Sequence, residues 1–350
     1  MNILVLSQAY PSEQNSYAMS YVHTRCIKYK QQNCDVSVLS FSAKESYFYE
    51  GVKVCTESEI DINQFDIIVS HAPNIKNHVR FLSRVNGRRI AIFFHGHEVL
   101  HTYRDYPEPY HWKKPSCFKR LIVNAYDYAK VKLMRYWLAR MSRSNSLGLV
   151  FVSKWMLNNF EKNLKCNASL FGRYVVIANA VNDVFYFERY TPADIAADFI
   201  TIRPLDDSKY SIDLVMALAK ANPSLSFHVY GKGEFFNHNS LHSNVKWFDG
   251  FVRQCDIPEL LNRYRAVLMP TRYDAQGVMT CEMATFGIPV VTSDISICHE
   301  MLDGFKNVMF LSNEDFAKPM KSMPAQSDSY EDRFLSDRLI SKELSFFNEL

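Results

Sequence analysis

Short apolar runs alternate with helix-like stretches along almost the whole chain, and this alternation most restricts the possible folds. The runs are rich in β-branched and aromatic residues, which is typical of strands buried on both faces of a sheet. The first half contains the runs Ile3–Leu6, Val36–Leu39, Ile67–Val69, Ile90–Phe94, Leu149–Val152 and Tyr174–Ile177. The second half contains the runs Phe199–Ile202, Leu225–Tyr230, Val245–Phe248, Ala266–Met269, Val290–Thr292 and Val308–Leu311. Strands that alternate with helices form parallel sheets, so the sequence predicts an α/β protein with two doubly wound, Rossmann-like domains.

Helix-like stretches separate most of these strands. They include Tyr17–Tyr29, Phe118–Met141, Lys154–Asn163, Ile212–Ala221, Ile257–Tyr264 and Val278–Phe286. A length of 350 residues suits two domains. We place the first domain at residues 1–178 and the second at residues 179–335. Residues 336–350 are expected to form a terminal helix that returns to the first domain.

The net charge of +3 conceals two halves of opposite sign. Residues 1–190 carry a net charge of +10 and residues 191–350 carry a net charge of −7. Halves of opposite sign indicate domains with different partners. The positive half could attract nucleic acid, but no nucleic-acid recognition motif accompanies the charge, so we expect no such partner.

Several common cofactor sites are missing from the sequence. A dinucleotide site needs G-x-G-x-x-G at a strand-to-helix turn, and Gly231-Lys232-Gly233 lacks the third glycine. The sequence also lacks a P-loop, and it contains no D-x-D pair, the usual acidic clamp of metal-dependent sugar transferases. We therefore expect neither a bound cofactor nor a metal requirement.

The segment from Pro270 to Glu300 carries the strongest local signal. Asp274 and Glu282 lie eight residues apart, and Gly277 between them precedes the helix-like stretch. Ligands of doubly wound sheets bind beyond the carboxyl ends of the strands, and Asp274 follows such an end. A helix N-terminus beside two carboxylates suits a ligand that has both a phosphate and many hydroxyls.

Other polar residues follow strand ends in the same way. Arg203, His95 and Gly231 each come directly after a predicted strand, and Lys209 lies a few residues beyond Arg203. Taken alone as surface residues, Arg203 and Lys209 would be unremarkable. A lone histidine after a strand is more often structural than catalytic.

Several ordered motifs in the second half resemble the donor-binding domain of retaining glycosyltransferase family 4, the glycosyl transferases group 1 with the GT-B fold. The resemblance covers about residues 198–312 and is looser in the first half. The motifs that carry it are Arg203 with Lys209–Leu214, Val229–Gly233, Asn244–Val252, Pro270-Thr271, Asp274-x7-Glu282 and Gly287–Ser293 in the second half, and Phe94-His95-Gly96, Phe151–Ser153 and Asn179–Val181 in the first.

The resemblance implies a retaining transfer of a hexose-type sugar from a UDP- or GDP-linked donor to a saccharide acceptor. The second domain would hold the nucleotide sugar, and the first would present the acceptor, expected to be lipid-linked in bacterial surface polysaccharide synthesis (O-antigen, capsule or exopolysaccharide). The implied catalytic residues are His95, Arg203, Lys209 and Asp274. The implied donor-binding residues are Gly277, Val278, Glu282, Gly231 and Glu300, although Glu300 could equally cap a helix or pair locally.

The first carboxylate of the motif departs from the family pattern. Asp274 stands where the family has Glu, and Ala275-Gln276 replaces its Gly-Phe. The shorter side chain fits either a different donor sugar or weakened activity. Two alternatives stand beside the transferase: a sugar-nucleotide epimerase of the same architecture, and a catalytically silent partner subunit that binds nucleotide sugar, which would explain Asp274.

A basic and aromatic segment runs from His111 to Arg143. One interpretation is a domain helix that packs on the sheet through an apolar face containing Phe118, Ile122, Ala125, Ala129 and Leu133. The other is a surface for an anionic membrane or acceptor. The residues assigned to that surface are Trp112, Lys113, Lys114, Lys119 and Arg120. No apolar run is long enough to span a bilayer, so we expect a cytoplasmic protein, peripheral on the inner face of the membrane.

Overall fold

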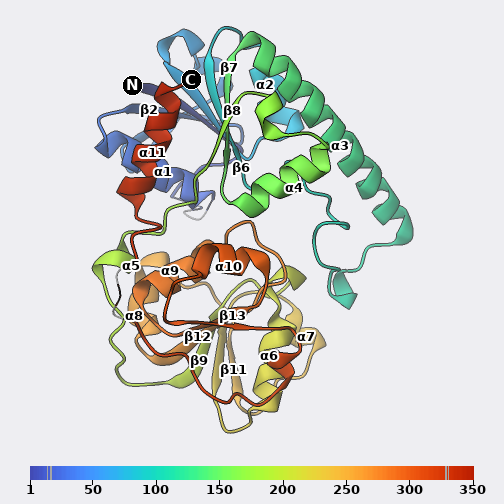
Figure 1. Ribbon diagram of the computed structural model, residues 1–350, viewed down its shortest axis with the longest axis vertical. Coiled ribbons are helices and arrows are strands. Elements are labelled where there is room, and N and C mark those ends of the chain that lie inside the picture. Colours follow the sequence, from blue (N-terminus) through green and yellow to red (C-terminus); the bar gives the residue numbers. More distant parts are fainter. Residues whose placement is uncertain (14, 16–17, 328, 330) are drawn as a thin grey trace. The chain divides into compact units, whose positions relative to one another are not determined.

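The computed structural model describes residues 1–13, 15, 18–327, 329 and 331–350. The chain divides into two compact units, each built on its own sheet (Figure 1). Unit 1 contains Met1–Thr102, Leu121–Ala180 and Ser336–Leu350. Unit 2 contains Tyr103–Arg120 and Val181–Leu335.

Unit 1 is built on an eight-stranded sheet with the order β3-β4-β2-β1-β5-β6-β7-β8. Every pairing is parallel except that of β3 with β4. The strands are β1 (Asn2–Ser7), β2 (Asp35–Ser40), β3 (Tyr47–Tyr49), β4 (Val52–Cys55), β5 (Ile67–His71), β6 (Arg89–Phe94), β7 (Ser146–Phe151) and β8 (Arg173–Val176). The chain order reverses between β1 and β5, which makes this point the topological switch of the sheet.

The hairpin of β3 and β4 is a feature that the sequence analysis did not predict. Glu50 and Gly51 form its two-residue turn, and both have positive φ angles, of 44° and 74°. Such a turn favours Asn-Gly or Asp-Gly, and Glu-Gly is a weaker form of the same signal. The hairpin adds an antiparallel edge to an otherwise parallel sheet.

Helices cover the sheet of unit 1. They are α1 (Ser20–Gln31), α2 (Arg80–Leu82), α3 (Cys117–Ser144), α4 (Lys154–Leu164) and α11 (Ser336–Asn348). The predicted start of the first helix at Tyr17 lies outside the described residues. The terminal helix α11 lies beside α1, as expected for a helix that returns to this unit (Figure 1).

A buried ion pair joins α1 to α11. Arg25 Nε donates to Glu343 Oε1 at 3.0 Å, and the hydroxyl of Tyr29 donates to Glu343 Oε2 at 2.5 Å. Arg25 and Glu343 are only 3% and 1% exposed. The apolar residues around them, including Phe346 and Phe347 of α11, belong to the main core of the unit.

Unit 2 is built on a six-stranded sheet with the order β11-β10-β9-β12-β13-β14. The strands are β9 (Ala197–Ile202), β10 (Phe227–Tyr230), β11 (Val245–Phe248), β12 (Tyr264–Met269), β13 (Val290–Ser293) and β14 (Val308–Leu311), all parallel. Renumbered from its first strand, this is the order 3-2-1-4-5-6 of a doubly wound sheet. Its switch point lies between β9 and β12.

The helices of unit 2 are short. They are α5 (Val184–Phe187), α6 (Ile212–Ala221), α7 (Phe235–His238), α8 (Ile257–Leu261), α9 (Val278–Phe286) and α10 (Ser296–Leu302). The bounds of α6 and α9 are those predicted from the sequence. All twelve apolar runs identified in the sequence also form strands, some with shifted ends.

The segment Tyr103–Arg120 groups with unit 2, whereas the sequence analysis had assigned it to the first domain. Its aromatic residues explain this difference. The hydroxyl of Tyr110 donates to Asp213 at 3.0 Å, and Trp112 stacks on His238 with a centroid distance of 4.6 Å. Apolar periodicity locates strands and helices, but it does not show to which core a connecting segment will pack.

Candidate functional site

The switch point of unit 2 brings together residues from two loops. Arg203 follows β9, and the loop from Pro270 to Gly277 follows β12, the neighbouring parallel strand. Because the connections of these strands run in opposite directions, their carboxyl ends leave a crevice in which ligands of such sheets bind. Four of the predicted site residues, Arg203, Asp274, Gly277 and Val278, lie at this point.

Arg203 is a buried cation, with 6% of its surface exposed. Its Nη2 donates to the carbonyl of Met269 at 3.1 Å and approaches Thr280 Oγ1 at 3.5 Å. Its Nε has no hydrogen-bond partner among the described residues. Burial lowers the pKa of Arg203, against the opposing effects of Asp274 and Tyr210, yet a guanidinium stays charged in proteins. The site thus holds a desolvated positive charge at the edge of the sheet.

Lys209 lies in the turn Ser208–Tyr210 and adds a second cation. Its Nζ is 3.2 Å from Asp207 Oδ2 and 4.8 Å from the centroid of the Tyr210 ring. The guanidinium of Arg203 lies over the same ring at 5.2 Å. Burial alone would lower the pKa of Lys209, but Tyr210, Asp207 and Asp274 together raise it. One aromatic ring therefore positions both cations, a role of Tyr210 that the sequence analysis missed.

The loop after β12 is tied to this turn. The carbonyl of Lys209 accepts hydrogen bonds from the backbone N–H of Arg272 at 2.9 Å and from Thr271 Oγ1 at 3.0 Å. Arg272 in turn forms an ion pair with Asp213 at 2.6 Å. These bonds fix the position of Lys209 relative to the loop that carries Asp274.

Asp274 and Gly277 shape the entry to α9. The carboxylate of Asp274 accepts a hydrogen bond from the backbone N–H of Gln276 at 3.1 Å. Gly277 has φ 75° and ψ 51°, a left-handed conformation that glycine adopts without strain, and helix α9 begins at Val278. A Cβ atom on Gly277 would lie 3.6 Å from Asp274 Oδ2. The structure thus brings the carboxylate and the helix N-terminus together.

Glu282 lies one turn further along α9 and is 3% exposed. Its Oε1 accepts hydrogen bonds from Gln254 Nε2 at 2.8 Å and from the backbone N–H of Asn182 at 3.3 Å. Burial raises the pKa of Glu282 to about 7, and the two hydrogen bonds only partly oppose this effect. The sequence analysis missed Gln254, which lies just after the Gly250–Arg253 loop and had no motif to mark it.

Gly231 allows the end of β10 to approach Arg203 closely. A Cβ atom on Gly231 would lie 1.8 Å from the backbone oxygen of Arg203, so any other residue would displace one of the two strands. Beside it, a cavity of about 500 Å³ is lined by Tyr230, Phe248 and Arg253 among others. The rings of Tyr230 and Phe248 stack with a centroid distance of 4.3 Å. The sequence analysis did not predict this cavity.

Glu300, the last of the predicted donor residues, lies on α10, which follows β13. Because β13 neighbours β12 in the sheet, α10 begins at the same edge as the loop of Asp274. Its role as a donor contact is a prediction.

His95 belongs to unit 1, at the end of β6. Its Nε2 is 3.3 Å from Nδ1 of His71, and its ring packs against Tyr21 with a centroid distance of 4.8 Å. Burial, and then the charge of Arg25, lower the pKa of His95 well below its ordinary value, so the ring is neutral at physiological pH. The buried carboxylate of Glu98 accepts the backbone N–H groups of His95 and Gly96 at 2.9 and 2.5 Å. Glu98, three residues beyond His95, is a further residue that the sequence analysis missed.

The residues predicted to face a membrane are partly engaged within unit 2. Lys113 Nζ lies 3.5 Å from both Asp206 and Glu234, and Arg120 pairs with Glu108 at 2.6 Å. Trp112 is half-buried against aromatic neighbours. Lys114 and Lys119 are exposed. Asp206 and Glu234 are far from Lys113 in the sequence, so the basic run alone did not show that this lysine has acidic neighbours.

The expected apolar face of α3 is oriented the other way. The interpretation that Phe118, Ile122 and Leu133 pack on the sheet is wrong, because these side chains are 73%, 52% and 51% exposed. The buried face is formed instead by Val131, Met134, Trp137, Leu138 and Met141. Two apolar faces exist on this helix, and periodicity could not tell which one is covered.

The part of the chain that the structure describes contains neither a metal-binding cluster nor a membrane-spanning helix. Among the described residues, no group of three or more His, Cys, Asp or Glu side chains is arranged to hold a metal ion. No described helix combines the length and the hydropathy needed to cross a bilayer. The absence of a metal requirement is a prediction that neither finding tests.

Comparisons with known proteins agree with the motifs of unit 2. Residues 201–323 match the family model described as glycosyl transferases group 1. The matched segment lies wholly within unit 2. The match contains Arg203, Lys209, Asp274, Glu282 and Glu300 within its bounds. No curated protein matches the sequence significantly.

Solved structures resemble the chain over nearly its whole length. Anabaena HepE in complex with UDP and glucose has 17% identity and a TM-score of 0.63, with 100% of both chains covered. Sucrose-phosphate synthase from Thermosynechococcus elongatus has 11% identity and a TM-score of 0.62, with 99% of this chain and 90% of that chain covered. WaaG, a glycosyltransferase involved in lipopolysaccharide biosynthesis, has 13% identity and a TM-score of 0.58, with 99% and 92% covered. The two units therefore have the GT-B fold, as predicted.

Proposed function

We propose that unit 2 binds a nucleotide sugar and that the protein transfers the sugar, a hexose, to a saccharide acceptor. One observation carries this proposal: Arg203 is a buried cation that forms no ion pair within the described residues, beside Lys209 and the N-terminus of α9. A buried charge without a partner is costly, and an anionic ligand would offset that cost.

The diphosphate of the donor suits this position. As the bond between sugar and phosphate breaks, negative charge builds on the leaving phosphate, and fixed cations and oriented N–H groups stabilise it. Arg203, Lys209 and the N–H groups at Gly277 and Val278 supply these elements without a metal ion. A metal-independent reaction is part of the proposal.

The carboxylates would contact the sugars of the donor. Asp274, beside the helix N-terminus, would accept hydrogen bonds from hydroxyls of the transferred sugar. Glu282 uses Oε1 for Gln254 and Asn182, which leaves Oε2 to meet the ribose. The cavity beside the stacked rings of Tyr230 and Phe248 has the size and the flat apolar wall that a nucleobase needs.

We further propose that the anomeric configuration is retained. The acceptor hydroxyl would attack the anomeric carbon on the face from which the nucleoside diphosphate leaves, and its proton would pass to the leaving phosphate oxygen. His95, as a neutral imidazole, would contribute a hydrogen bond to the donor sugar and no positive charge. The motif resemblance supports this route.

A lipid-linked acceptor and a role in bacterial surface polysaccharide synthesis are the finest parts of the proposal. They are supported by the likeness to WaaG, a glycosyltransferase involved in lipopolysaccharide biosynthesis. A UDP-linked donor is favoured by the likeness to HepE, which was solved with UDP and glucose.

A panel of UDP- and GDP-sugars tests the reaction class. The protein should release nucleoside diphosphate in the presence of a saccharide acceptor and more slowly by hydrolysis in its absence. Recovery of an isomerised donor would establish the epimerase instead. Donor binding without turnover under any condition would establish a silent binding subunit, and either result would overturn the transferase.

A further inference from the structure

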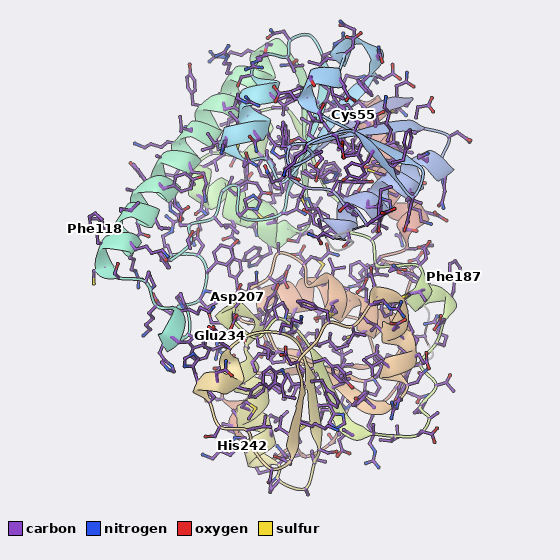
Figure 2. All side chains as sticks on the ribbon, turned by 180° about the vertical axis from the view of Figure 1, so that it is seen from behind. Cys55, Phe118, Phe187, Asp207, Glu234 and His242 are labelled. Carbon is purple, nitrogen blue, oxygen red and sulfur yellow. The ribbon has the colours of Figure 1, made fainter. Side chains whose placement is uncertain are left out.

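Helix α3 carries apolar side chains on two opposite faces. One face is buried in unit 1 through residues such as Met134, Leu138 and Met141. The other face is exposed, and its members follow one another at intervals of three or four residues. They are Phe118, Ile122, Ala125, Ala129, Leu133 and Tyr136. Figure 2 labels Phe118 at the start of this helix, where its side chain lies on the surface.

An apolar helix face of this length is normally covered. Tyr136 is 70% exposed, and the neighbouring Leu121, Tyr126 and Tyr128 are also exposed. The helix contains 28 residues and therefore extends for about 40 Å. No described residue covers this outward face, so its apolar surface is available to a partner.

The charges around this face are of one sign. Lys119, Lys132, Arg140 and Arg143 lie on or beside it, and Lys132 Nζ is 4.4 Å from the centroid of the Tyr128 ring. The one carboxylate of the helix, Asp127, points to the buried side, where it pairs with Lys130 at 2.7 Å and accepts the N–H of Thr102 at 2.6 Å. The outward face of α3 is thus apolar and aromatic with a cationic border.

We propose that this outward face of α3 docks on an anionic lipid bilayer, with the helix lying in the plane of the interface. Leucine, isoleucine and phenylalanine side chains suit the acyl boundary, tyrosines suit the headgroup level, and lysine and arginine suit anionic headgroups. A second copy of the chain fits less well, because two such faces would bring like charges together. The surface shares Lys119 with the predicted one at residues 112–120 but excludes Lys113 and Arg120, which salt bridges already engage.

The proposal deepens the lipid-linked acceptor of the proposed function but does not depend on sugar transfer. Vesicle binding and nucleotide release are measured separately, so either can fail alone. A protein that releases nucleotide with a soluble acceptor yet ignores vesicles would contradict only the docking surface.

The test compares three outward residues with three exposed residues elsewhere. The variant Ile122→Gln/Leu133→Gln/Tyr136→Gln removes apolar side chains from α3. The control Leu170→Gln/Phe187→Gln/Leu241→Gln removes side chains of similar exposure from other surfaces. Flotation with vesicles of phosphatidylcholine mixed with phosphatidylglycerol should show binding of the wild type and control, and at least about ten-fold weaker binding of the α3 variant. Circular dichroism checks that all three are folded.

A charge variant provides the second arm. Lys132→Gln/Arg140→Gln/Arg143→Gln should weaken binding to the anionic vesicles and reduce its dependence on salt. The proposal is overturned if the wild type does not float with anionic vesicles, or if the apolar variant binds them as the wild type does. It is also overturned if sedimentation shows a dimer that the apolar variant splits while vesicle binding is absent, because the partner is then a second copy.

Discussion

Each unit contains one deeply buried arginine near its switch point, and the two differ in their partners. Arg25 of unit 1 is 3% exposed and pairs with Glu343, whereas Arg203 of unit 2 is 6% exposed and has no carboxylate within ion-pair distance among the described residues. The pKa values reflect this: burial lowers both, but Glu343 and Tyr29 reverse the effect for Arg25 and raise its pKa. Arg25 has its counter-ion within the chain, whereas Arg203 has none among the described residues and would meet one in the proposed anionic ligand.

The groups at the strand ends also differ in charge between the two switch points. In unit 1 the strand ends carry neutral groups: His71 and His95 are held uncharged by burial, and Gln8 Oε1 accepts hydrogen bonds from the amides of Asn74 and Asn77. In unit 2 two cations share one tyrosine ring. The same kind of switch point thus supports a neutral polar environment suited to hydroxyl groups in unit 1 and a cationic one suited to phosphate in unit 2.

The largest effect should follow from removing the counter-ion of Arg25. Glu343→Ala leaves a buried, unpaired guanidinium and should destabilise unit 1 by about 3–5 kcal/mol. The matched control is Glu349→Ala, just beyond the end of the same helix, whose exposed ion pair with Arg173 should contribute about 1 kcal/mol or less. Urea unfolding of both variants measures the difference. If both variants lower the free energy of unfolding by the same small amount, Arg25 does not depend on Glu343 as a counter-ion. The two buried arginines would then not differ in the way described.

Replacing Arg203 should affect the ligand more than the fold. Arg203→Ala should lower turnover by about 10²–10³-fold and weaken binding of nucleoside diphosphate, since one positioned donor to a developing anion contributes on that scale. Arg203→Lys should recover only part of the loss because it lacks the bidentate fork. Calorimetric titration with UDP and GDP gives the affinities, with the exposed Arg265→Ala as control. His95→Ala should keep the nucleotide affinity; a loss there would contradict the division of roles.

The two units should respond to acid in opposite directions. Burial raises the pKa of Glu282 from 4.5 to about 7, so the carboxyl group releases its proton at lower pH in the unfolded chain than in the folded one. The free energy of unfolding of unit 2 should therefore fall by about 3 kcal/mol as pH rises from 4.5 to 7. In unit 1 burial lowers the pKa values of His71, His78 and His95. These histidines bind protons at higher pH in the unfolded chain than in the folded one. The free energy of unfolding of unit 1 should therefore fall as pH drops below 6.5.

Amide hydrogen exchange, corrected for intrinsic rates and analysed separately for each unit, measures how the stability of each unit changes with pH. Glu282→Gln should remove the unit 2 slope, and its difference from the wild type isolates this carboxyl from other titrating groups such as His228. If the stability of both units changes with pH in the same direction, and Glu282→Gln leaves unit 2 unchanged, Glu282 is ionised in the folded protein at low pH and the prediction fails.

The sequence predicted the strands of both sheets except β3 and β4, together with the loop of Asp274, because parallel strands buried on both faces leave continuous apolar runs and Gly277 marks the start of α9. It did not predict the partners that decide the chemistry. Gln254 meets Glu282 across 28 positions, and tertiary packing brings Arg203 over the ring of Tyr210, the neighbour of Lys209 in the chain. Nor could periodicity assign the outward face of α3, since apolar residues repeat at helical spacing on both of its sides.

The smallest effect concerns donor choice at Asp274. Asp274→Glu restores the carboxylate of the family motif and lengthens the side chain by one methylene, at the cost of the hydrogen bond that Asp274 now accepts from Gln276. We expect the ratio of kcat/KM between two donor sugars that differ in one hydroxyl to change by about ten-fold, or about 1.4 kcal/mol. Asp303→Glu, on an exposed carboxylate, is the control. If Asp274→Glu instead raises turnover of every donor equally, the aspartate limits activity and does not select the sugar. If both the ratio and the turnover are unchanged, Asp274 does not contact the sugar. The two cations, Arg203 and Lys209, would then be the only functional difference between the switch point of unit 2 and that of unit 1.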